Sequence, residues 1–330
     1  MAKISRRISV HNYRANLAPR SFLLLITAVA ALAAGAAAHE YWIEPRKTVE
    51  RGKSFELAAY SGERFVNGER KLLTPEKLRG LRFVDSLGPQ DLLSALAQDV
   101  DVRTVKTRVA GTAIVALHSK HSYLELEPAK FNEYLKEEGL NTIRELRIKD
   151  GKDNEPGREL YQRCTKMFVQ VSDRAQESET DTKKKNQSSV ARAPVGLPFE
   201  IIPATDPTQA KTGQNLSVLV LFRGEPAGNI LLRLFHRSTD ASVPNAKAKE
   251  SRTTAEGSAT FTIDQAGEYL ISGVHMIRAA AGVDPRHAEA EWESFFSSIT
   301  FTTGEEAPPP AKITDKNEKT ESRPKDQKNN

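Results

Sequence analysis

Short runs of alternating apolar and polar residues follow one another after residue 40 and predict a mainly β protein. In the first half of the chain they lie at residues 41–43, 54–60, 81–84, 112–117 and 123–126. Glycines separate these runs, which is typical of strands joined by turns. We therefore expect an N-terminal β-rich domain over residues 39–171.

The period of the pattern changes at Pro128, a residue type that is favoured at the first position of a helix. Apolar side chains then recur at the i, i+3, i+4 spacing of one helical face, namely Phe131, Tyr134 and Leu135. Gly139 follows where a helix would end. The sequence thus predicts a short helical insertion in the β-rich domain.

Two further helical segments follow in the pattern. Ile143 and Leu146 predict a second short helix. Residues 156–163 predict the start of a third helix that runs into a strand at residues 167–171.

A second domain begins after residues 172–192, which we interpret as a charged, flexible linker because almost none of their side chains favours burial. Residues 193–303 carry strand patterns every eight to twelve residues, roughly seven strands in all, which is typical of an immunoglobulin-like or prealbumin-like β-sandwich. In the last strand we expect Phe295, Ile299 and Phe301 to share the inward face. Residues 304–330 predict a disordered tail.

The first 38 residues have the order of a signal peptide: basic residues, an apolar run at 22–34, then the small residues 36–38. Cleavage after Ala38 would leave His39 as the first residue, with a free amine and an imidazole that together can chelate a transition metal. We expect an exported protein, periplasmic or extracellular, that meets a membrane only through the signal segment if that segment stays uncleaved.

Charge and cysteine content exclude several classes. Five of the 48 basic residues and none of the 43 acidic ones fall in the first 38 residues, so the rest of the chain has no net charge. Without a basic stripe, we expect no nucleic-acid partner. Cys164 is the single cysteine, so the chain cannot form an internal disulfide. We expect this thiol to act as a small apolar core group.

Five segments resemble an exported bacterial family, the domain-of-unknown-function family 4198, which was once described as a nickel-uptake component. They are residues 39–45 (HEYWIEP), 124–135, 196–203, 224–228 and 292–295. The resemblance covers about residues 38–301. It implies a periplasmic or secreted protein, partly a β-sandwich, with a connection to metal uptake and a metal-transport or other envelope protein as a possible partner.

The candidate metal ligands are histidines and one carboxylate. His39 is the first, and His275 at the end of a predicted strand is its expected partner, with a locally hydrogen-bonded histidine as the alternative. His287 and Glu291 lie in the following loop and could complete a nitrogen and oxygen site for Ni, Cu or Zn. His118 and His121 would point to opposite faces of a strand unless a turn separates them.

No nucleophile elbow, phosphate loop or dinucleotide motif occurs in the sequence, so we expect no enzyme. Our leading hypothesis is a binding protein that holds or delivers a divalent transition metal through His39. The alternatives are an interaction or carbohydrate-binding sandwich, for which Trp42 and Trp292 would supply exposed rings, and a histidine-brace oxidative enzyme. Burial of both rings in the core is the competing interpretation.

Overall fold

The structure is a computed structural model that describes residues 40–66, 68–94, 96, 102–173 and 190–304. The predicted signal peptide, His39 and residues 305–330 lie outside these ranges. No helix within the described ranges is both long and apolar enough to cross a membrane.

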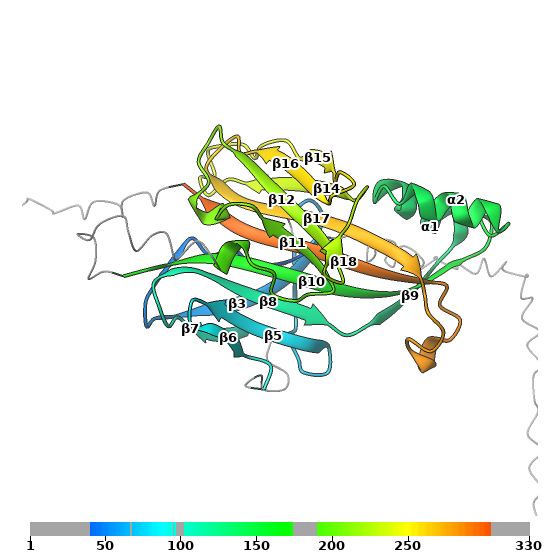
Figure 1. Cartoon of the computed structure of the whole chain (residues 1–330), viewed down its shortest axis with the longest axis horizontal. Helices are drawn as coiled ribbons and strands as arrows, with labels where there is room; N and C mark the ends of the chain where they lie inside the picture. The colour runs from blue at the N-terminus through cyan, green and yellow to red at the C-terminus, as the bar shows by residue number, and fades with distance from the viewer. Residues whose placement is uncertain (1–39, 67, 95, 97–101, 174–189, 305–330) are drawn as a thin grey trace, which may run out of the picture. The chain divides into compact units, whose positions relative to one another are not determined.

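A ten-stranded sheet runs through the middle of the described protein (Figure 1). Along its main path the strands are β15 (Lys249–Arg252), β14 (Leu231–Arg237), β17 (Gly267–Arg278), β18 (Trp292–Thr303), β10 (Gly157–Ser172), β8 (Gly111–Ser119), β5 (Leu78–Asp85) and β6 (Gly88–Asp91). The strands β2 (Thr48–Glu50) and β9 (Ser122–Leu126) also pair with β10.

Two four-stranded sheets cover the two faces of this central sheet. One contains β1 (Glu40–Ile43), β3 (Ser54–Gly62), β4 (Glu69–Lys71) and β7 (Val102–Lys106). The other contains β11 (Phe199–Pro203), β12 (Asn215–Phe222), β13 (Glu225–Pro226) and β16 (Ser258–Thr262). The described strands therefore form three layers.

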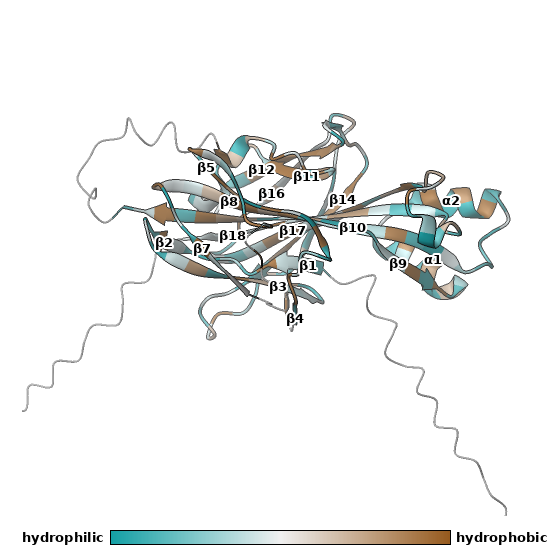
Figure 2. Cartoon of the chain, turned by 90° about the horizontal axis from the view of Figure 1, so that it is seen from below, coloured by the Kyte–Doolittle hydropathy of each residue, from teal (hydrophilic) through white to brown (hydrophobic). Residues whose placement is uncertain are grey.

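The central strand β8 is apolar on both faces because each face meets a covering sheet. In β8, Ile114 and Ala116 belong to the core beneath the β11–β12 sheet, while Ala113, Val115 and Leu117 belong to the core beneath the β1–β3 sheet. Figure 2 shows such apolar stretches in brown along the strands. This explains why the run at residues 112–117 is almost continuously apolar.

The helical insertion is confirmed. Helix α1 (Pro128–Glu137) begins at the predicted proline, and α2 (Asn141–Lys149) follows. Gly139 lies between the helices with a φ of 65°, a conformation that glycine adopts without strain. Phe131, Tyr134 and Leu135 are buried, as the helical spacing predicted. The described residues of the second half include the one-turn 3-10 helices η2 (Val190–Arg192), η3 (Pro207–Gln209) and η4 (Pro285–His287).

The third predicted helix is wrong, because residues 157–163 belong to the strand β10. Residues 157–161 of β10 pair with β9 on one side. On the other side β10 pairs with β18, from Glu159 opposite Trp292 to Met167 opposite Thr300. Pairing on both sides satisfies the backbone groups and overrides the local helical pattern.

The same strand pairing joins the two halves of the chain. Strand β10 comes from the predicted N-terminal domain and β18 from the predicted sandwich, yet they are neighbours in one sheet. The described end of the predicted linker also packs into the protein, since Ala191 is fully buried in the core beneath β11 and β12. The expected division at residues 172–192 therefore does not separate two independent sheets.

The C-terminal β-sandwich is confirmed, as is the mainly β class. Strands β11, β12 and β16 pack on β14, β17 and β18 through one core, and Phe295, Ile299 and Phe301 lie in it with at most 1% of their surface exposed. Cys164 is also fully buried there. These residues define the face of the central sheet that we call the sandwich face.

Candidate functional site

A small hollow lies where β1 begins, on the face of the central sheet opposite the sandwich face. It is lined by Glu40 and Tyr41 of β1, by Glu138 at the end of α1, by Thr165 of β10 and by residues 272–274 and 296–298 of β17 and β18. We call it the β1 hollow. Its volume of about 20 Å³ is room for one water-sized species.

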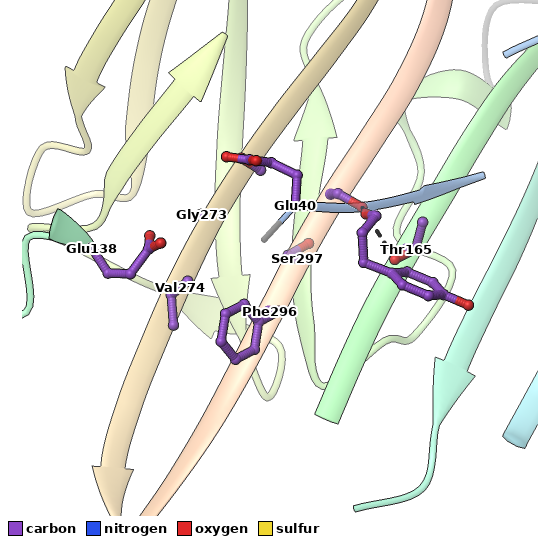
Figure 3. Close-up of a pocket in the computed structure, with 10 residues that line it drawn as sticks. Glu40, Glu138, Thr165, Gly273, Val274, Phe296 and Ser297 are labelled. Carbon is purple, nitrogen blue, oxygen red and sulfur yellow. Dashed lines mark hydrogen bonds between the residues drawn. The ribbon is translucent and has the colours of Figure 1, made fainter. Parts of the chain in front are cut away.

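The two acidic side chains of the β1 hollow approach it from different elements. Figure 3 shows the side chains of Glu40 and Glu138 near β17, on the side where Gly273 and Val274 are labelled. One oxygen of Glu40 accepts a hydrogen bond from the backbone N–H of Arg64 at 2.9 Å. Glu40 therefore has a defined position at the start of the described chain.

Glu138 is a buried carboxylate with one strong cationic partner. Its Oε2 accepts a hydrogen bond from Nη1 of Arg233 at 2.8 Å. Burial raises the pKa of Glu138 from 4.5 to about 7 despite that guanidinium, and the charges of Glu40 and Glu137 raise it further. The pKa of this carboxyl group therefore lies near neutral pH.

A second buried carboxylate lies close enough to interact electrostatically with Glu138. Glu159 of β10 is fully buried, and its Oε2 accepts a hydrogen bond from the Tyr134 hydroxyl at 3.4 Å. Burial raises the pKa of Glu159 to about 8, and the charge of Glu138 adds to the rise. Its Oε1 is buried and has no partner among the described residues. Two buried carboxylates, Glu138 and Glu159, therefore lie in this region of the fold.

Strand β1 is held on this face by hydroxyl groups of β18. The Ser298 hydroxyl donates to the carbonyl of Tyr41 at 2.6 Å, and the Thr300 hydroxyl donates to that of Ile43 at 2.8 Å. Ser298 and Thr300 of β18 thus face β1. The odd-numbered residues Phe295, Ile299 and Phe301 point to the sandwich face.

His275 lies on the sandwich face, away from β1. It pairs with Phe295 in the register of β17 and β18, and its ring contacts Phe222 edge-on at 4.5 Å between centroids. Burial lowers the pKa of His275, and the nearby charge of Arg223 lowers it further. The side chain is therefore a neutral ring in an aromatic cluster, on the other side of the sheet from Glu40 and Glu138.

His287 and Glu291 have separate partners. The ring of His287 stacks on Tyr123 at 4.2 Å between centroids with an interplanar angle of 4°. Glu291 forms ion pairs with Arg147, at 3.4 Å, and with Lys152. The Glu291 carboxylate thus fastens the loop before β18 to the end of α2.

The structure does not bring His275, His287 and Glu291 together as one ligand set. Within the ranges that the structure describes, no group of three or more His, Cys, Asp or Glu side chains is arranged to hold a metal ion. His39 lies outside those ranges, so its predicted role is not addressed by this geometry.

A polar network that the sequence analysis did not assemble lies on the sandwich face. Nε2 of His118 contacts Oε1 of Gln162 at 2.6 Å, and Nε2 of His121 contacts Oε1 of Glu293 at 2.9 Å. Nε2 of Gln162 donates to the same Glu293 oxygen at 3.0 Å. Burial lowers the pKa of His118, more than its bond to Gln162 raises it. Gln162 therefore links the two histidines and the glutamate.

The turn that these two histidines require is present, since β8 ends at Ser119 and β9 begins at Ser122. In the sequence, the gap between the predicted strands at residues 112–117 and 123–126 was the indication of this turn. Glu293, however, is 172 residues from His121, and no local pattern links the two.

Both tryptophans are core residues, which confirms the core interpretation. Trp42 and Trp292 are each 1% exposed. Trp42 packs against Tyr60 and Phe65, and Trp292 packs among the residues of α1 and α2. They form no exposed platform on which a sugar ring could stack.

Comparison with known protein families identifies the chain's relatives. A family described as "Domain of unknown function (DUF4198)" matches residues 36–277. The chain belongs to this family. The matched range of DUF4198 includes Glu40, Glu138 and His275, and it ends before His287 and Glu291. No protein with a curated description matches the sequence.

Solved structures similar to this DUF4198 chain have low identity. The D0-D1 domain of intimin is 11% identical over 80% of this chain and 98% of its own, with a TM-score of 0.19. Trypsin-activated alpha-2-macroglobulin from Escherichia coli is 9% identical over 81% of this chain and 16% of its own, with a TM-score of 0.18. Dimeric latent PorU from Porphyromonas gingivalis is 8% identical over 84% of this chain and 21% of its own, with a TM-score of 0.17. At these TM-scores we draw no functional argument from them.

Proposed function

We propose that this DUF4198 protein is an exported, non-enzymatic binding protein, periplasmic or secreted, for one divalent transition-metal ion such as Ni, Cu or Zn. The observation that carries the proposal is the pair of carboxylates, Glu40 and Glu138, at a hollow where β1 begins. His39 immediately precedes Glu40 in the sequence. After signal cleavage His39 would be the first residue and would offer an amine and an imidazole one position before Glu40.

The chemistry of the hollow suits such an ion. Two nitrogen ligands and one or two carboxylate oxygens are a set that Ni(II), Cu(II) and Zn(II) accept. The volume of about 20 Å³ fits a single ion or water rather than an organic substrate. A protein of this kind would pass its ion to a metal-transport protein or another envelope protein.

His275 is the less suitable partner for His39. Its ring lies among Phe199 and Phe222 on the sandwich face, whereas β1 lies on the opposite face. We therefore assign the carboxylate of Glu138, in place of the imidazole of His275, as the ligand from the folded domain. His287 and Glu291 keep their contacts with Tyr123 and Arg147.

Calorimetric titration of the processed protein with Ni(II), Cu(II) and Zn(II) tests this proposal. Because a residue ahead of His39 removes the free-amine chelate, we expect a chain with one extra N-terminal residue to bind at least about tenfold more weakly. Mass spectrometry of the exported protein establishes whether His39 is its first residue.

Two matched variants distinguish the assigned carboxylate from its neighbour. Glu138→Gln should weaken metal binding about tenfold or more, since one charged ligand is lost, whereas Glu137→Gln should leave the affinity unchanged because Glu137 is exposed. His275→Phe, which fits its aromatic surroundings, should also bind normally. Equal affinities for the Glu138→Gln, extended and wild-type chains would refute the proposal.

A further inference from the structure

A second hollow lies at the end of the central sheet where the β8–β9 turn meets the loop between β17 and β18. Its volume is about 340 Å³, and it is lined by Arg79, Lys120, His121, Val283, Asp284 and Arg286. We call it the cationic hollow. The volume is within the range of small-molecule sites.

Backbone pairing brings the first two cations of this hollow together. Arg79 lies at an irregularity of β5, where its pairing register with β8 shifts between Leu78 and Gly80. Such bulges redirect a side chain. Lys120 is fixed beside the start of β5, since its backbone N–H donates to the carbonyl of Lys77 at 2.8 Å. Its Nζ donates to the carbonyl of Pro75 at 3.2 Å.

The acidic side chain of the hollow is already neutralised. Asp284 accepts two hydrogen bonds from Arg286, at 2.9 Å from Nε and at 2.6 Å from Nη2. These bonds lower the pKa of Asp284. Among the residues that the structure describes, Arg79 and Lys120 have no such carboxylate partner; their recorded polar contacts are with His121 and Pro75. The lining thus carries three cationic side chains and one carboxylate.

The wall behind these cations contributes no free negative charge. Nη2 of Arg79 donates to Nδ1 of His121 at 3.2 Å. Nε2 of His121 contacts Oε1 of Glu293 at 2.9 Å, and the Glu293 carboxylate also accepts from Gln162 and lies 3.6 Å from Arg223. The buried carboxylate is satisfied from within the protein, which leaves Arg79 and Lys120 available at the mouth.

We propose that the cationic hollow binds a small oxyanion with two negative charges, of the phosphate, sulfate or dicarboxylate class. Arg79 retains N–H groups that do not point at His121, and Lys120 has three N–H donors of which one is used. Two neighbouring cations without a counter-charge repel each other, and a dianion between them removes that repulsion. This site does not depend on the proposed metal site.

The test is calorimetric titration of the metal-free, full-length processed protein with sulfate and, separately, malonate. Acetate serves as the monoanion control. We expect both dianions to bind, acetate to bind at least about tenfold more weakly, and dianion affinity to fall as sodium chloride is raised.

Charge-removing variants locate the site. Arg79→Gln and Lys120→Gln should each weaken sulfate binding about tenfold or more, the size expected when one charge-assisted hydrogen bond is lost. Lys130→Gln removes the same charge at an exposed position of α1 and should change the sulfate affinity by less than about twofold. Because Arg79 and Lys120 are both exposed, their variants should unfold at the same temperature as the wild type. Absence of dianion binding by the wild type, or an equal loss in Lys130→Gln, would overturn the proposal.

Discussion

A buried ion pair between two layers of the fold allows a quantitative prediction. Lys166 of β10 and Glu200 of β11 are 1% and 2% exposed, and Nζ of Lys166 donates to Oε1 of Glu200 at 2.9 Å. The Glu200 carboxylate also accepts hydrogen bonds from three backbone N–H groups, those of Val195, Gly196 and Leu197. The pair therefore fixes both a layer contact and the loop before β11.

The perturbation is Lys166→Met, which keeps most of the side-chain volume and removes the ammonium group. Removing one partner of a buried pair costs about 3–5 kcal/mol, because the remaining charge is left uncompensated. Glu200 keeps its three backbone donors, which places the expected loss near the lower limit, at about 3 kcal/mol. The exposed pair Lys249–Asp264, with a similar distance of 2.7 Å, is the matched control. Lys249→Met should cost at most about 1 kcal/mol.

Urea unfolding followed by circular dichroism measures both losses of stability. A double-mutant cycle isolates the interaction energy between Lys166 and Glu200. Glu200→Gln alone should also be strongly destabilising, since an amide N–H₂ would then face backbone N–H groups. The double variant Lys166→Met/Glu200→Gln should lose less than the sum of the single variants, by about 1 kcal/mol or more. If Lys166→Met cost no more than Lys249→Met, burial would not be the quantity that sets the energy of this pair.

Three further predictions concern buried groups. The pKa of Glu138 is raised to about 7, so the stability contributed by its protonated form is complete below pH 4.5 and is lost as the pH rises through 7. Glu138→Gln should remove this pH dependence, which amounts to about 3 kcal/mol or less. Unfolding free energies at pH 5 and pH 8 measure it. Gly157→Ala should destabilise the protein by about 1–3 kcal/mol, because the added Cβ would lie 2.1 Å from Cγ of Phe131; Gly80→Ala, which meets no atom within 4 Å, should be much milder in the same denaturation assay. Burial raises the pKa of the Cys164 thiol to about 12, so a thiol reagent at pH 8 should label the native protein only as fast as it unfolds; rapid native labelling would contradict the assigned burial.

Local sequence patterns predicted those parts of the fold that depend on near neighbours. Pro128 and the spacing of Phe131, Tyr134 and Leu135 predicted α1 correctly, since helix period and first-turn preferences act within a few residues. The alternation in the last strand placed Phe295, Ile299 and Phe301 on one buried face. Burial of both tryptophans followed from their size and apolar surface.

Other features required contacts between distant residues. The segment at residues 157–163 is a strand because β9 and β18 pair with it on both sides, and no local pattern contains that information. For the same reason the shared central sheet was not visible in a sequence that changes composition at residues 172–192. The network of His118, His121 and Glu293 likewise depends on a pairing between β10 and β18.

The sequence by itself determined the mainly β class of the protein, the helix α1 and the buried face of the last strand, because these follow from the local period of the apolar residues. Only the tertiary structure decided which face each strand presents to which layer. That choice places His275 among aromatic rings and Glu138 beside the start of β1. Side-chain period is local, whereas the partner of a strand is selected by packing summed over the whole core, so the candidate ligands could be named from the sequence but not assembled.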